Sequence, residues 1–128
     1  MTKRIKTKLV LAMLTCLILS FVSCGVQQNL SVSYMLHEGM TKQEAEAIMG
    51  APVKSDFDKN VEEWHYCRTG QNTADEFIAL FFYEGKLIAK KNYTVTISDT
   101  RGVHGSCEKF IKMGNYRQPE VVVEIRSR

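Results

Sequence analysis

The sequence predicts an α+β fold in which a short N-terminal helix, or a pair of helices, packs on an antiparallel meander of three to four strands. Three observations lead to this fold class. A helix signature at 41–49 is followed, from residue 53 onward, by runs that alternate as strands do. The dipeptide Glu84-Gly85 then separates two of these runs, as a two-residue hairpin turn does. We therefore expect a two-layer sandwich of helix on sheet.

The helix is predicted from its ends. Thr41-Lys-Gln-Glu44 is a capping box, in which the Thr41 hydroxyl accepts from the Glu44 backbone N–H and the Glu44 carboxylate reaches back. Apolar residues then share one helical face: Ala45, Ile48 and Met49. Gly50 ends the helix. The segment before it, 30–36, fits a short helix or an extended lead-in equally well.

Strand-like runs follow at 53–57, 62–68, 77–83 and 87–97. In the second run Trp64 and Tyr66 point to one side, which we expect to face the helix. The third run is apolar on both faces, which predicts a strand in the interior of the sheet. In the fourth, we expect one face to carry Leu87, Ala89, Tyr93, Val95 and Ile97. Past residue 98 the pattern weakens to a loop at 99–106 and a helical turn at 107–113, and 120–125 fits an edge strand or a loose tail.

Residues 1–23 are predicted to be a signal peptide. A basic start without acidic residues precedes the apolar run Leu9 to Leu19 and small residues. That run is shorter than the roughly 20 residues of a membrane-spanning helix, so we expect its removal. The ending Ser23-Cys24 resembles a lipobox, which implies cleavage before Cys24 and lipid on its sulfur. This covalent lipid is the one cofactor that we expect, and it would anchor the chain firmly because each buried methylene contributes ~0.8 kcal/mol.

The mature chain is expected at the periplasmic face of the outer membrane, with membrane lipid as its first partner. Gly25 follows Cys24, and in the lipobox pattern the absence of an Asp there favours the outer membrane. The signal holds four of the 17 Lys and Arg and no Asp or Glu, so 13 basic and 14 acidic side chains remain, a net charge of −1. A nucleic-acid-binding protein is thereby excluded. We divide the chain into the signal 1–23, a lipidated tether 24–31, a domain 32–98 and a C-terminal extension 99–128.

Two cysteines remain in the mature fold, Cys67 and Cys107. In an oxidising compartment they most simply form a disulfide that ties the extension to the domain. Closing a loop of about forty residues would stabilise the fold by roughly 3–4 kcal/mol. The alternative is a tetrahedral zinc site, because each cysteine has a histidine nearby, giving the set His65, Cys67, His104 and Cys107.

No catalytic residue is predicted. Glu62 and Glu63 point to opposite faces of a strand and are typical of a solvated strand start. A disulfide would remove Cys67 as a nucleophile. The aromatic residues are most simply core, and the candidates for an exposed binding patch among them are Trp64, Tyr66 and Phe82.

The order of the motifs resembles the SmpA/OmlA domain, the small BamE lipoprotein component of the outer-membrane β-barrel assembly machinery. The residues that carry the resemblance lie within 36–97: Gly39-Met40-Thr41, Gly50-Ala-Pro52, Glu63-Trp-His-Tyr66, Leu80-Phe-Phe82 and Gly85-Lys-Leu87. The resemblance implies a non-catalytic scaffolding lipoprotein that binds other envelope proteins, such as barrel-assembly components. Cys67, Cys107 and the segment 99–128 lie outside the family pattern. They leave open an inhibitor-like or ligand-binding lipoprotein on the same fold, for which 99–118 would project as a rigid loop with exposed anchors.

Overall fold

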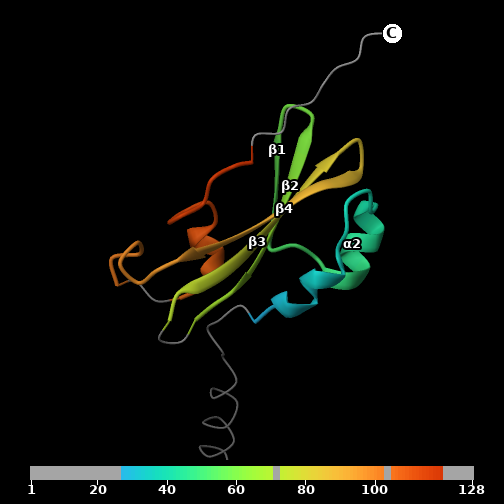
Figure 1. Ribbon diagram of the computed structural model, residues 1–128. Helices are drawn as coiled ribbons and strands as arrows, with labels where there is room; N and C mark the ends of the chain where they lie inside the picture. Colours follow the sequence, from blue (N-terminus) through green and yellow to red (C-terminus); the bar gives the residue numbers. More distant parts are fainter. Residues whose placement is uncertain (1–26, 71–72, 103–104, 120–128) are drawn as a thin grey trace, which may run out of the picture.

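The computed structural model describes residues 27–70, 73–102 and 105–119 (Figure 1). In chain order the elements are η1 (Leu30–Met35), α2 (Lys42–Met49), β1 (Lys54–Asp58), β2 (Val61–Arg68), β3 (Asp75–Tyr83), β4 (Lys86–Val95) and η2 (Cys107–Phe110). The signal, Cys24, His104 and the run 120–125 lie outside the described residues, so our expectations for them stay predictions.

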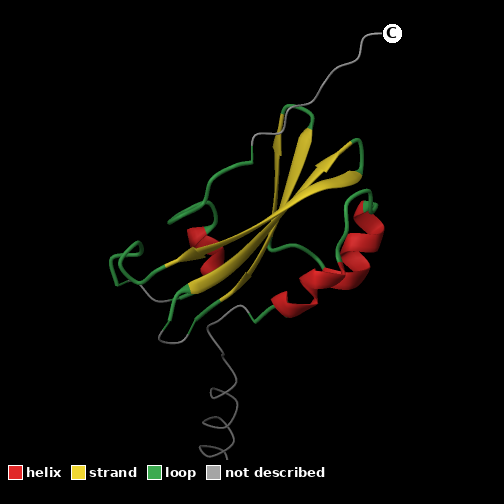
Figure 2. Cartoon of the chain, viewed as in Figure 1, coloured by secondary structure: helices red, strands yellow, loops and turns green. Residues whose placement is uncertain are grey.

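The strands form one antiparallel sheet in the order β1-β2-β3-β4, which confirms the predicted α+β meander. Figure 2 shows the 3-10 helix η1 and the α-helix α2 on one face of the sheet, and η2 with the residues after it on the other. The helices η1 and α2 and the sheet therefore form the two predicted layers. Residues 107–119, which we call the cover, lie on the second face of the sheet.

The predicted capping box starts α2. The Thr41 side-chain oxygen accepts from the Glu44 backbone N–H at 3.2 Å, and Glu44 Oε2 accepts from the Thr41 backbone N–H at 2.7 Å. Gly50 follows with φ 77° and ends the helix. Beneath α2 lies the first core, made of Leu30, Ala45, Met49, Trp64, Tyr66, Ile78, Leu80, Phe82 and Leu87.

The second core lies on the opposite face of the sheet and contains Cys67, Phe77, Ala79, Phe81, Tyr93, Val95, Cys107 and Phe110. Because β3 supplies alternate residues to both cores, the interior position predicted for it is confirmed. The predicted face of β4 was wrong at Leu87. A β-bulge lets Phe81 pair with Ala89 and Phe82 with Leu87, so one extra residue turns Leu87 toward the helix. Ile97, expected on that face, lies beyond the end of β4 and is exposed.

The first described residues are already attached to the domain, although we had assigned residues up to 31 to a tether. Gln27 bridges to Arg68 beside the end of β2. The Gln28 side chain donates to the Ala51 carbonyl and accepts from the Cys67 backbone N–H, each at 2.9 Å. Asn29 then caps η1. The folded domain therefore begins by residue 27.

Candidate functional site

The predicted bond between Cys67 and Cys107 is present as a disulfide. Both residues are fully buried, Cys67 at the end of β2 and Cys107 at the start of η2. The bond joins residues forty positions apart and fixes the C-terminal cover to the second sheet face. Since the two sulfurs are bonded to each other, neither is free as a thiolate to bind zinc. Within the described ranges no group of three or more His, Cys, Asp or Glu is placed to hold a metal ion.

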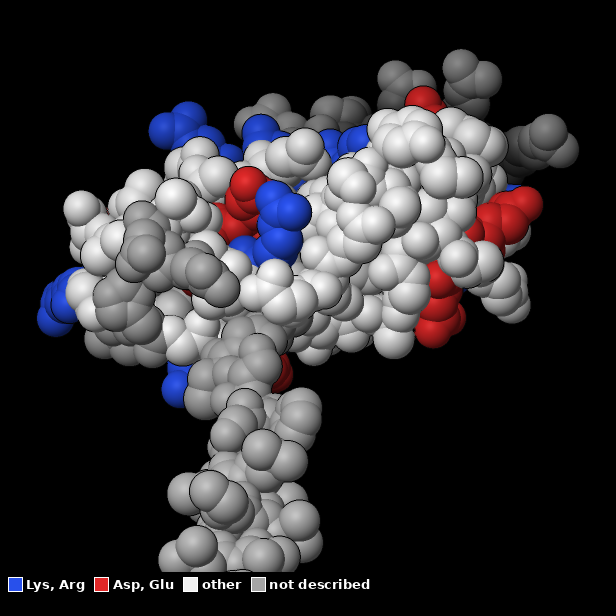
Figure 3. All heavy atoms as spheres, turned by 90° about the horizontal axis from the view of Figure 1, so that it is seen from below, with Lys and Arg blue, Asp and Glu red and all other residues white. Residues whose placement is uncertain are grey.

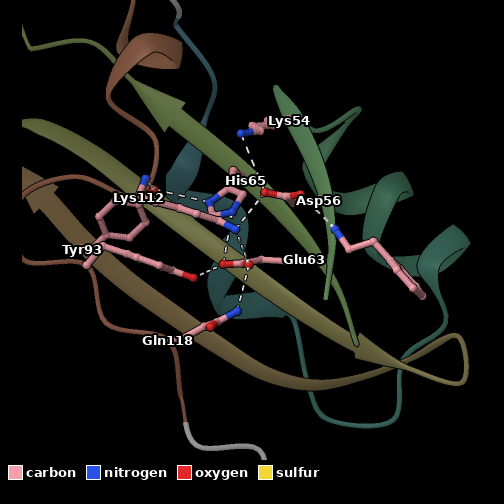
Figure 4. Close-up of polar contacts among 9 residues, drawn as sticks. Lys54, Asp56, Glu63, His65, Tyr93, Lys112 and Gln118 are labelled. Atoms are coloured by element: carbon pink, nitrogen blue, oxygen red, sulfur yellow. Dashed lines mark hydrogen bonds and ion pairs between the residues drawn. The ribbon is translucent and has the colours of Figure 1, made fainter. Parts of the chain in front are cut away.

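A buried polar cluster lies between β1, β2 and the cover (Figure 4). Its centre is Glu63, which is 2% exposed, although we expected a solvated strand start. Lys112, which follows η2, places Nζ 2.9 Å from Glu63 Oε2 and 2.9 Å from Asp56 Oδ2. Register pairing sets Asp56 opposite Glu63, so one lysine bridges two adjacent strands.

The remaining contacts of Glu63 come from aromatic and amide groups. His65 is fully buried, with Nε2 3.2 Å from Glu63 Oε1 and Nδ1 3.4 Å from the Tyr93 hydroxyl. The Tyr116 hydroxyl donates to Glu63, and Gln118 Nε2 donates to it at 3.4 Å. Every one of these groups belongs to the sheet or to the cover, and none comes from the helix side.

Electrostatics keep Glu63 charged. Burial acts to raise the pKa of the Glu63 carboxyl, but the contacts from His65 and Lys112 outweigh burial and hold the pKa below its usual value. Burial raises the pKa of Tyr93 to about 12, so its phenol stays protonated. A carboxylate engaged on both oxygens by its own protein is suited to clamping the cover onto the sheet.

This cluster has no local signal in the sequence, because Lys112, Tyr116 and Gln118 are about fifty residues away from Glu63 along the chain. What could have been noticed is the pair Glu63 and His65, two polar residues on the same strand face. Because their neighbours are apolar, these two residues indicate a buried polar pair, and a buried carboxylate needs a cation close to it.

The candidate binding aromatics lie in the first core instead of forming an exposed patch. Trp64 and Phe82 stack obliquely with ring centroids 4.8 Å apart, and Tyr66 is fully buried. The polar atoms of the two amphipathic rings are satisfied: Trp64 Nε1 donates to Glu62 Oε1 at 2.6 Å, and the Tyr66 hydroxyl donates to the Gly50 carbonyl at 3.0 Å. These three aromatic side chains therefore contribute to the packing of the first core and do not form a binding surface.

The cover also differs from the projecting loop expected of an inhibitor. Phe110 is buried against the second core and Tyr116 packs on Tyr93, with ring centroids 4.7 Å apart. The aromatic side chains of the cover thus face the sheet, where they are not available to anchor a target.

An open groove of about 420 Å³ lies at the hairpin end of the sheet, on the helix side. Its lining comes from the start of α2, from β1 and β2, and from the β3–β4 turn: Lys42, Phe57, Asn60, Glu62, Phe82, Tyr83, Glu84 and Gly85. Phe57 is 68% exposed, and a Lys42–Glu62 ion pair stands beside it. α2 begins beside the β3–β4 hairpin, where its N-cap Thr41 bridges to Lys86. It ends near Tyr66, toward the opposite end of the sheet, and the groove beside its first residue stays open.

Comparison with protein families gives one match, to the family described as outer membrane protein assembly factor BamE domain, over residues 26–106. The chain belongs to the BamE family. The match includes η1, α2 and the four strands of the described sheet and ends just before Cys107, so the cover lies outside it. No curated protein and no solved structure matches the chain. Within the described ranges, no helix is long and apolar enough to cross a bilayer. Family membership connects this chain with outer membrane protein assembly.

Proposed function

We propose that this BamE-family chain is a lipid-anchored, non-catalytic lipoprotein at the periplasmic face of the outer membrane, where it binds other proteins of β-barrel assembly. The observation that carries the proposal is the family match over residues 26–106, which covers the described sheet, η1 and α2. The lipobox-like Ser23-Cys24 at the end of an export signal supports the anchor.

The shape of the domain supports protein binding away from the membrane. In Figure 1 the described chain begins at the lower end of the molecule, and the β1–β2 and β3–β4 hairpins lie at the upper end. The groove with Phe57 belongs to the hairpin end. We infer that a partner protein inserts an apolar side chain there, because an exposed aromatic beside an open groove is a common anchor of protein interfaces.

The polar cluster supports a structural role in place of catalysis. Glu63 is engaged by Lys112, His65 and Tyr116, all from the same chain. A general acid or base needs access to a substrate within hydrogen-bond reach, and this carboxylate is closed in by the cover. The cluster therefore holds the fold together while the groove makes the contact.

Photocrosslinking in the native envelope tests the proposal. A photoreactive phenylalanine analogue at Phe57 should give crosslinks to barrel-assembly components, identified by mass spectrometry. The matched control carries the same analogue at Lys109, an exposed position of η2 on the opposite face, and should give few or none. Crosslinks from both positions alike, or a complete lack of assembly components from position 57, would reject this function.

A further inference from the structure

The 3-10 helix η1 holds two large apolar side chains in solvent. Tyr34 is 80% exposed and Met35 is 49% exposed. They do not belong to a loose segment, since Leu30 is buried in the first core and Lys90 Nζ donates to the Ser33 carbonyl at 2.8 Å. The outward direction of Tyr34 and Met35 is thus fixed by the packing of the rest of η1.

This helix lies close to the predicted anchor along the chain. Gln27 is already attached to the end of β2, and Cys24 is three residues before it. Three residues span at most about 11 Å even when fully extended. A lipid on Cys24 would therefore hold the Gln27 end of the domain against the headgroup layer.

The surface at this end suits a bilayer interface. The sequence of η1, Leu-Ser-Val-Ser-Tyr-Met, has no charged residue. Seen from below in Figure 3, a wide part of the surface is uncharged, while acidic and basic side chains lie together near the middle of the face and others lie toward its edges. Next to η1, the charges of Arg68 and Glu76 are paired with each other. Tyrosine favours the interface because its ring is apolar and its hydroxyl stays hydrated, and methionine adds an unbranched apolar side chain.

We propose that η1 lies in the membrane interface, with Tyr34 and Met35 inserted among the lipid headgroups and upper acyl carbons. The inference rests on the proposed anchor at Cys24 and adds an orientation to it. Two side chains alone bind a bilayer weakly, but the anchor already confines the domain there, so a weak insertion suffices to set its tilt. With η1 down, the groove at the hairpin end points away from the membrane.

Quenching by brominated lipid tests this orientation. The mature lipidated protein is placed in vesicles of phosphatidylethanolamine and phosphatidylglycerol that carry bromine high on the acyl chains. Two variants are compared, Tyr34→Trp and, as the matched control at the hairpin end, Phe57→Trp. Both replaced side chains are exposed, so neither change disturbs the core, and the buried native Trp64 gives the same background in both.

The expected result is a several-fold greater loss of the added fluorescence for Tyr34→Trp than for Phe57→Trp. A double change, Tyr34→Ser with Met35→Ser, should keep the protein on the vesicles while randomising its tilt, seen as a rise in quenching of a Trp at position 57. Equal quenching at positions 34 and 57 on vesicle-bound protein would overturn the inference and leave the proposed function standing. Loss of the lipidated protein from the vesicles would overturn the anchor as well.

Discussion

Replacing Lys112 by Met should destabilise the domain by removing the cation from a buried carboxylate. Lys112 is 31% exposed and its Nζ lies 2.9 Å from both Glu63 and Asp56. Met keeps much of the side-chain volume, so packing of the cover changes little and the loss comes from the charge. The Glu63 side chain, at 3% exposure, cannot regain water in exchange.

The expected loss at pH 7 is about 3 kcal/mol, the lower end of the range for removing one partner of a buried ion pair. The lower end applies because His65 and Tyr116 still contact Glu63, and because Asp56, at 40% exposure, can turn to water. The matched control is Lys54→Met. Lys54 Nζ lies 3.8 Å from the same Asp56 carboxylate and is 49% exposed, so its removal should change stability by less than about 0.5 kcal/mol.

The pH dependence follows from the direction of the Glu63 shift. Because the pKa of Glu63 is held below its unfolded value, its stabilisation is present above the unfolded pKa of roughly 4.3 and is lost as pH falls through the folded pKa. The difference between wild type and Lys112→Met should therefore be full at pH 7 and shrink below about pH 4, where the unpaired carboxyl is protonated.

Urea unfolding followed by the fluorescence of buried Trp64 measures these differences, with the disulfide intact in every variant. An equal loss for Lys112→Met at pH 7 and at pH 3.5 would refute the electrostatic reasoning and assign the effect to packing. A loss for Lys54→Met as large as that for Lys112→Met would refute the role of burial.

Three further predictions concern the bond, the cap and the groove. Replacing both Cys67 and Cys107 by Ala should lower the free energy of unfolding by about 4 kcal/mol, because the disulfide closes a forty-residue loop. Calorimetry that finds no drop in Tm would contradict this expectation. Thr41→Ala should remove about 1 kcal/mol by deleting the cap of α2, whereas Thr41→Ser should restore most of it in the same denaturation assay. Phe57→Ala should leave Tm unchanged, because the ring is 68% exposed. The same change should reduce the recovery of assembly components in pull-downs from solubilised outer membranes. Unchanged recovery would argue against the groove as the binding site.

Features encoded locally could be predicted from the sequence. The capping box at Thr41 and Glu44 needs only four residues, and the turn at Glu84-Gly85 needs two, with φ values of 49° and 77° as expected of such a turn. The disulfide could be predicted because two cysteines remain in the mature fold and the expected compartment is oxidising. Alternation then placed Trp64 under the helix because a strand has a fixed period of two.

Features that depend on distant pairing could not be predicted. The bulge that turns Leu87 to the helix side arises from the register of β4 against β3, which no run of residues in β4 shows by itself. Glu63 was expected in solvent because its cation, Lys112, arrives only when the cover folds back. The groove forms where Lys42 at the start of α2 meets β1, β2 and the β3–β4 turn, and a meeting of segments this far apart in the chain is a matter of three-dimensional placement.

Acylation of one sulfur is the claim on which the membrane location, the orientation of η1 and the accessibility of the groove all depend. Intact-mass measurement of the protein extracted from envelopes tests it most directly. We expect a chain that begins at Cys24 and carries the added mass of a diacylglycerol and a further acyl group. A mature chain that begins elsewhere, or one that begins at an unmodified Cys24 and still fractionates with the outer membrane, would contradict it.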